Sequence, residues 1–194
     1  MKAIFTTLSA ILLSLNLCAQ SAENQHLLFK GVPIDGTMSE YVEKMKLNGF
    51  VVVATEPGAT MLQGDFASYK KVLIGVVTLQ QKDLVSKIRV MFPKKEDWAS
   101  LYGNYSNLKD MLTQKYGTPT EVIENFPSYP NVKDESLKFM YVSGGNCNYT
   151  TVFETPNGKI TLYLDHIESD CYVALSYLDK INGEIMTAKA IDDL

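Results

Sequence analysis

The stretch from Glu96 to Gly117 carries a stripe of large apolar residues at helical spacing. Its members are Trp98, Leu101, Tyr105, Leu108 and Leu112. The intervals between them are 3, 4, 3 and 4, which place all of them on one face of an α-helix. Burial of such side chains contributes roughly 1.5 to 3 kcal/mol each as an upper bound. We therefore predict an amphipathic helix that starts at Glu96 or Asp97 and packs on a sheet.

A second helix is predicted near the N-terminus. Thr37 and Glu40 match a capping box, in which the Thr hydroxyl accepts a backbone N–H and the Glu side chain reaches back to the cap. The helix continues through Tyr41 to Asn48-Gly49, where glycine is able to adopt a positive φ.

Segments that alternate apolar and polar residues predict strands on both sides of the longer helix. Before it they cover 50–55, 60–66, 70–79 and 84–92, and after it 120–125, 149–155, 159–166 and 171–177. Asn157-Gly158 between two such segments is a strong signal for a β-hairpin. In 84–92, Arg89 lies on one face and Ile88 on the other, so we expect one buried sheet face and one mostly polar face.

Three segments give weaker signals. Residues 126–133 contain Pro127 and Pro130 and are expected to be irregular, and 135–142 fits either a short helix or an edge strand. The apolar run 27–29 is expected to dock onto the core, with His26 as a surface residue.

The fold class that follows is α+β, with two helix-plus-antiparallel-meander repeats forming a curved sheet with helices on one face. The expected divisions are a signal peptide (1–20), a leader (21–36), two repeats (37–93 and 94–180) and a tail or short helix (181–194). The signal peptide is predicted from Lys2, the apolar run that follows it and small residues near Ala19. This predicts a secreted or periplasmic protein. Lipidation at Cys18, giving a membrane-anchored envelope protein, is the alternative, although Leu17 is bulky for a lipobox.

Charge and composition limit the partners. The formal net charge of -4 argues against nucleic acid, because binding to phosphate needs a basic face. His26 and His166 are far apart in sequence and lack metal-ligand spacing, so we expect no metal or cofactor. Cys147 and Cys171 are a candidate disulfide in an oxidising compartment, with two separately buried thiols as the alternative. The bond requires the chain at 144–146 to bend inward.

Both halves of the chain share one order of elements: an amphipathic helix, a glycine that ends it, and an antiparallel meander of about four strands. This order resembles the β-lactamase inhibitor protein fold and the small envelope-assembly lipoproteins of the SmpA/OmlA type. The phrases 29–37 (FKGVPIDGT) and 177–182 (YLDKIN) are similar to those of a group of secreted bacterial proteins. The resemblance implies an envelope or secreted protein that acts by binding other proteins, and it carries no catalytic signature.

Two kinds of candidate site follow from the residues. Aromatic side chains near an irregular, proline-containing segment are typical of recognition surfaces, and the candidates are Phe126, Tyr129, Tyr141 and Tyr149. Acid and imidazole groups concentrate only at Asp165-His166, Glu168 and Asp170, which also fit a solvated turn.

The favoured function is a non-catalytic protein-binding module of the inhibitor or assembly-factor type, with a concave, aromatic-rich sheet face and another envelope or secreted protein as its partner. A structural envelope accessory is the first alternative. A hydrolase that uses His166 is the second.

Overall fold

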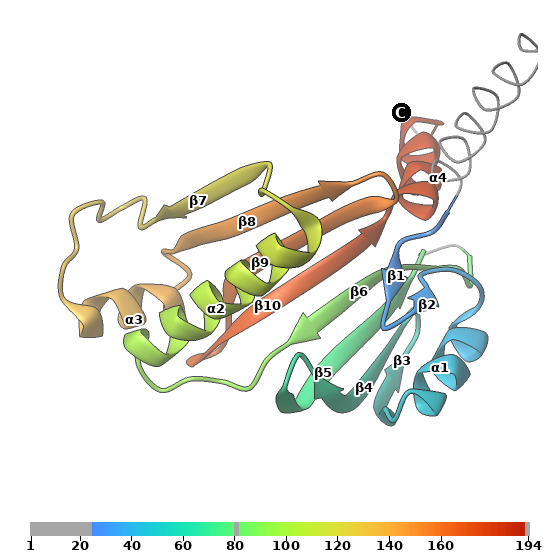
Figure 1. Ribbon diagram of the computed structural model, residues 1–194, viewed down its shortest axis with the longest axis horizontal. Helices are drawn as coiled ribbons and strands as arrows, with labels where there is room; N and C mark the ends of the chain where they lie inside the picture. Colours follow the sequence, from blue (N-terminus) through green and yellow to red (C-terminus); the bar gives the residue numbers. More distant parts are fainter. Residues whose placement is uncertain (1–24, 80–81, 193–194) are drawn as a thin grey trace, which may run out of the picture.

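The computed structural model describes residues 25–79 and 82–192, which form an α+β protein (Figure 1). The expected signal peptide with Cys18 lies outside the described residues, as do the first residues of the 21–36 leader. The elements in chain order are β1 (Leu28–Phe29), β2 (Val32–Pro33), α1 (Met38–Leu47), β3 (Val51–Glu56), β4 (Ala59–Phe66), β5 (Tyr69–Thr78), β6 (Val85–Met91), α2 (Trp98–Tyr116), β7 (Glu121–Asn125), α3 (Glu135–Ser143), β8 (Asn148–Thr155), β9 (Gly158–Ile167), β10 (Asp170–Asp179) and α4 (Lys180–Asp192).

One eight-stranded antiparallel sheet spans the described molecule. Its strand order is β3-β4-β5-β6-β10-β9-β8-β7. Each half of the chain contributes four adjacent strands, and the halves meet where β6 pairs with β10, for example Ile88 with Tyr177. The predicted α+β class and the antiparallel sheet are confirmed. The eight predicted strands all exist, with ends within two residues of those expected.

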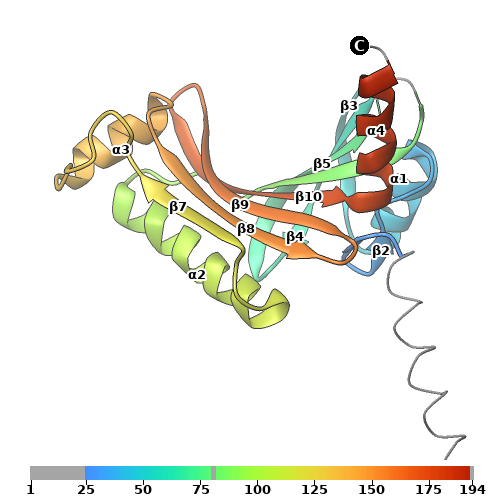
Figure 2. The same cartoon turned by 90° about the horizontal axis from the view of Figure 1, so that it is seen from above.

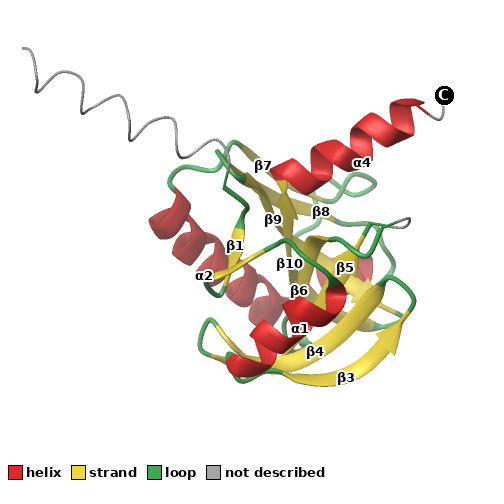
Figure 3. Cartoon of the chain, turned by 90° about the vertical axis from the view of Figure 1, so that its right-hand side faces the viewer, coloured by secondary structure: helices red, strands yellow, loops and turns green. Residues whose placement is uncertain are grey.

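The main core lies between one face of this sheet and the helices α1 and α2. Ile74, Ile88 and Leu175 point into it from central strands, and Tyr41 and Leu101 enter it from the two helices. All five members of the predicted helical stripe are buried. Figure 2 shows α2 along one side of the sheet, and Figure 3 shows α1 beside the outermost strand β3.

The helix ends follow the predicted capping chemistry. In α1 the Glu40 N–H donates to the Thr37 hydroxyl at 3.3 Å, and the Thr37 N–H donates to the Glu40 carboxylate at 3.0 Å. In α2 the carboxylate of Asp97 accepts from the Ser100 N–H at 2.8 Å. That helix ends at Gly117, whose φ of 86° lies in the region that favours glycine.

The two segments with open or approximate assignments are helical. Residues 135–143 form α3, capped by Asp134, and bury Val142 in the main core. The last helix, α4, begins at Lys180, one residue before the expected tail or short helix of 181–194, and Asp179 caps it by accepting the Asn182 N–H at 2.9 Å.

Three expectations need correction. The helices do not all share one face, since α4 leaves the end of β10 on the side opposite α2, with Gly183 against Leu178 (Figure 2). Leu28 is exposed, because alternation in β1 sends only its neighbours Leu27 and Phe29 into the core. His26 is not a simple surface residue, because its ring lies 3.0 Å from the buried carboxylate of Asp179.

Candidate functional site

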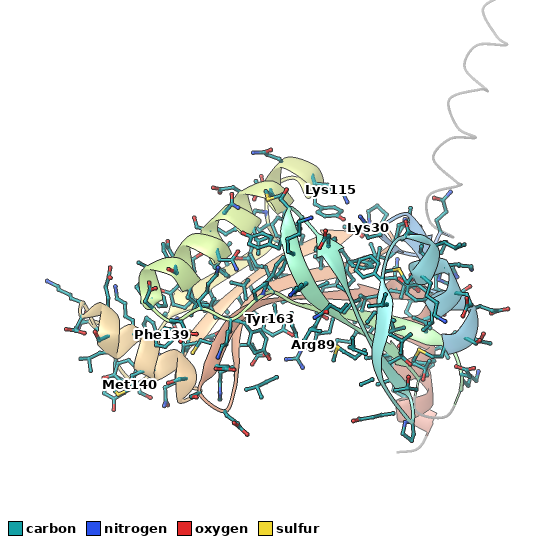
Figure 4. All side chains as sticks on the ribbon, turned by 90° about the horizontal axis from the view of Figure 1, so that it is seen from below. Lys30, Arg89, Lys115, Phe139, Met140 and Tyr163 are labelled. Carbon is teal, nitrogen blue, oxygen red and sulfur yellow. The ribbon has the colours of Figure 1, made fainter. Side chains whose placement is uncertain are left out.

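The face of the sheet opposite α1 and α2 is the principal candidate surface. The ladder places Leu73, Met91, Ala174 and Tyr163 in one row across β5, β6, β10 and β9. Paired residues point to the same side of a sheet, and these residues alternate along their strands with main-core residues such as Ile74 and Leu175. The row therefore lies on the face that α1 and α2 leave free. We call it the helix-free face, because neither α1 nor α2 lies on it and α4 meets it only at the end of β10, near Leu178. In Figure 4 the labelled Arg89 and Tyr163 lie near each other on the side of the sheet away from α2.

A second apolar cluster has formed on the helix-free face, separate from the main core. Met91, Tyr172 and Ala174 are buried there, and Met61, Leu73 and Tyr163 pack against them while half-buried. Burial raises the pKa of both the Tyr163 and the Tyr172 phenols, so both rings stay neutral at physiological pH. The face therefore offers amphipathic aromatic surface of the kind that protein interfaces use.

Arg89 is the centre of the polar part of this face. Its guanidinium donates to the carboxylate of Asp165 and, from Nη2, to the hydroxyl of Tyr172 at 3.2 Å. To reach Asp165 on β9, the side chain has to cross β10. The β10 residue paired with Arg89 is Ser176, and the one paired with Asp165 is Tyr172. Ala174 lies between these two on the same face, and its small side chain leaves room for the diagonal crossing. About a third of the Arg89 side chain stays exposed, at 38%.

Near the β3 edge of the helix-free face there is a small hollow of about 120 Å³. Its lining is formed by Ala54, Glu56, Ala59, Thr60, Met61 and Gly75. The small residues create the hollow, since Gly75 carries no side chain beside Arg89. A hollow of this size accommodates part of one side chain of a partner.

The predicted aromatic candidates divide into buried and exposed members. Phe126 is 4% exposed and packs against Trp98, with ring centroids 5.5 Å apart, so in this structure it supports the core. Tyr149 also packs on Trp98 and is half-buried. Tyr129 is 47% exposed and stacks in parallel on Tyr141 of α3 at 4.1 Å. Tyr129 is thus the most exposed of the four candidates.

Cys147 and Cys171 are free thiols that belong to the same core cluster. The pKa of Cys147 is raised to about 12, mainly because the thiol is buried and to a smaller extent because Cys171 lies nearby. Gly145 has a φ of 71°, and a side chain there would lie 3.2 Å from the ring of His166, the ladder partner of Cys171. Gly145, two residues before Cys147, therefore lies beside the β9 residue that pairs with Cys171.

The Asp165-His166 region lacks a paired acid and imidazole among the described residues. The side chain of Asp165 is engaged by Arg89, and Nδ1 of His166 lies 3.2 Å from the backbone carbonyl of Glu168. Asp170 forms an exposed ion pair with Lys94 at 2.9 Å. The side chains of Asp165, His166 and Asp170 thus each contact a group other than one another.

Within residues 25–79 and 82–192, no group of three or more His, Cys, Asp or Glu side chains converges on a metal-binding geometry. None of the helices described is both long enough and apolar enough to cross a membrane. Comparisons with protein-family models, with curated proteins and with solved structures each returned no match.

The residues of the helix-free face were not predicted from the sequence. The alternation in 84–92 places Arg89 on the side of its strand that was expected to be mostly polar. The available signal was the residue type: Met91, Tyr163 and Tyr172 alternate with core positions, and large apolar residues on an exposed face indicate contact. Which of them cluster depends on the pairing of β6 with β10.

Proposed function

We propose that this protein is a non-catalytic module that binds another protein through the helix-free face. The observation that carries the proposal is the apolar cluster of Met91, Tyr172 and Ala174 around Arg89, on a face that neither α1 nor α2 covers. Arginine, tyrosine and methionine are enriched where protein interfaces concentrate their binding energy. The role is of the inhibitor or assembly-factor type, in a secreted or periplasmic protein.

We further propose that the two halves are repeats of one unit, similar to those of the β-lactamase inhibitor protein fold. In support, each half has a helix that packs on the same sheet face and four strands that are adjacent in the sheet. The second half differs by the insertion of α3 between β7 and β8. Two repeats joined edge to edge give one continuous surface for a partner.

Affinity capture with immobilised protein tests the binding proposal. An envelope extract of the host organism supplies the partners, which mass spectrometry identifies, and titration of the purified partner then gives a dissociation constant. We expect Arg89→Ala and Tyr163→Ala each to weaken binding by about 2 kcal/mol or more, because hot-spot truncations have effects of that size.

Matched controls separate this face from other surfaces. Lys94→Ala removes an exposed ion pair with Asp170 and is expected to leave binding unchanged. Tyr129→Ala tests whether the stacked loop tyrosine belongs to the same interface. A partner that binds equally well to the Arg89 and Tyr163 variants would contradict the assignment of the face. Absence of any saturable partner would contradict the binding module itself.

A further inference from the structure

The strand β3 is an edge of the large sheet that has little protection against pairing. It is the first strand in the order and pairs only with β4. All six of its residues are exposed, and Val51, Val52 and Val53 are 59%, 41% and 49% exposed. An edge strand presents unpaired backbone N–H and C=O groups, and natural proteins usually guard such edges with charges, prolines, β-bulges or a cover. Of these devices β3 has the bulge at Val53. From Val51 to Thr55, β3 has no charged residue and no proline.

The opposite edge of the sheet carries the protection that β3 lacks. In β7, Glu121 and Glu124 surround Val122 and Ile123, and Glu124 forms an ion pair with Lys109 of α2 at 2.5 Å. Pairing of β3 with β7 of another copy would place these carboxylates against the valines. It would also leave a free edge at each end and generate an open filament. The asymmetry between the edges favours β3 as the one that accepts a strand.

The faces of β3 are compatible with an antiparallel copy of itself. Val52 and Thr55 pair with Leu62 and Thr60, which point into the main core. The β4 residues between Leu62 and Thr60 and on either side of them point to the other face of the sheet. Their partners in β3 are Val51, Ala54 and Glu56, which therefore lie toward the helix-free face. The bulge leaves Val53 without a ladder partner in β4.

A self-pairing centred between Val53 and Ala54 matches the faces. It places Val51 opposite Glu56 and Val52 opposite Thr55, each pair on one side of the sheet. Val53 then lies opposite Ala54. No glutamate faces a glutamate in this register, so the repulsion of like charges across strands does not arise.

We propose that two copies of this chain associate through β3, in the antiparallel register that pairs Val53 of one copy with Ala54 of the other. The two-fold axis of this pairing is perpendicular to the sheet. The pairing joins the two sheets into one continuous sheet and closes the assembly as a dimer. Both helix-free faces then lie on the same side of the joined sheet. The dimer does not depend on the function proposed above, because β3 association needs no third protein.

Sedimentation equilibrium of the purified protein at a series of concentrations tests the dimer. We expect a species of twice the monomer mass. Val52→Lys and Val53→Lys introduce charges at the edge, and each is expected to raise the dissociation constant roughly tenfold or more. Far-ultraviolet circular dichroism verifies that these variants remain folded, since both valines are exposed.

Val122→Lys is the matched control, since it changes a valine of similar exposure, 47%, on the other edge. This variant is expected to keep the dimer. Hydrogen exchange provides a second measurement: backbone amides in Val51–Glu56 become protected as concentration rises, whereas those in Glu121–Asn125 do not. A monomer at every concentration overturns the proposal. So does a dimer that survives both β3 variants, or one that Val122→Lys abolishes.

Discussion

The imidazole Nδ1 of His26 lies 3.0 Å from a carboxylate oxygen of Asp179, a residue 153 positions further along the chain. Asp179 is fully buried, and it also accepts the Leu27 N–H at 2.6 Å and the Asn182 N–H at 2.9 Å. The other ring nitrogen of His26 lies 3.3 Å from the carboxylate of Asp35. One buried carboxylate therefore ties the beginning of the described chain to the first turn of α4.

Asp179→Ala is expected to reduce the free energy of unfolding by about 2–4 kcal/mol, because it leaves the buried N–H groups of Leu27 and Asn182 without acceptors. Asp179→Asn keeps one oxygen acceptor and should lose less. Urea unfolding followed by circular dichroism measures both. Asp170→Ala is the control, since its carboxylate is exposed and contributes at most about 1 kcal/mol. If Asp179→Ala and Asp170→Ala reduced the free energy of unfolding equally, the buried carboxylate would stabilise the fold no more than an exposed one.

The hydroxyl of Tyr105 lies 2.6 Å from that of Thr151, and this pair connects α2 to β8 inside the core. Tyr105→Phe is expected to reduce the free energy of unfolding by about 1–2 kcal/mol, because it leaves the Thr151 hydroxyl buried without that partner. The Tyr105→Phe, Thr151→Val double variant lacks both hydroxyl groups. Thr151→Val should therefore reduce the free energy of unfolding less in the Tyr105→Phe background than in the unchanged protein. Strict additivity of the two changes would exclude the coupling.

Gly158 is the position where a side chain is least tolerable. A Cβ atom there would lie 2.2 Å from the backbone carbonyl oxygen of Leu178, and its φ is 153°. Gly158→Ala therefore requires the β8–β9 turn to separate from β10 and is expected to cost about 3 kcal/mol or more. Gly103→Ala is the opposite case: its Cβ meets open space on a helix, so a gain of up to about 1 kcal/mol is expected. Thermal unfolding of both variants gives the comparison.

The thiol of Cys147 is expected to react slowly with iodoacetamide in the folded protein. Its pKa is raised from 9.0 to about 12 by burial, so at pH 9 the folded chain holds mainly thiol while the unfolded chain is about half thiolate. The folded state thus keeps the thiol proton to a higher pH than the unfolded state does. The stability linked to this group is fully present below pH 9 and is lost as the pH rises toward 12. Peptide mapping of the alkylated protein in buffer and in urea measures the difference in rate.

Oxidation is expected to join Cys147 and Cys171, which share one core cluster. The reaction should be slow at neutral pH because the attacking thiolate is scarce. Once formed, the disulfide should stabilise the protein by an amount on the order of 3 kcal/mol. Mass spectrometry of non-reduced peptides after treatment with oxidised glutathione detects it, and Cys147→Ser is the control. If both cysteines stay reduced after prolonged treatment, the alternative of two separate buried thiols is correct.

Local signals in the sequence predicted most elements of this fold. The stripe from Trp98 to Leu112 predicted α2, and the Thr37 to Glu40 capping box predicted the start of α1, because both signals act within a few residues. Asn157-Gly158 predicted the β8–β9 hairpin for the same reason. Segment 135–142 could not be assigned, since short apolar runs fit a helix and a strand equally well.

The candidate site was much less predictable. Composition near two prolines selected Phe126 as a contact residue, yet the structure places its ring against Trp98, because composition does not indicate which side of a loop packs on the core. Arg89 was assigned to the correct face of its strand, but not to its partners Asp165 and Tyr172.

By itself, the sequence determined the helices, the strands and the face on which most strand residues lie, because periodicity and capping are properties of neighbouring residues. Only the tertiary structure decided that β6 pairs with β10 and that β3 remains an open edge. It also decided that Arg89 meets Tyr172 and that His26 meets Asp179. The physical reason is that pairing between distant strands depends on the packing of the whole core, in which each local element is compatible with several partners.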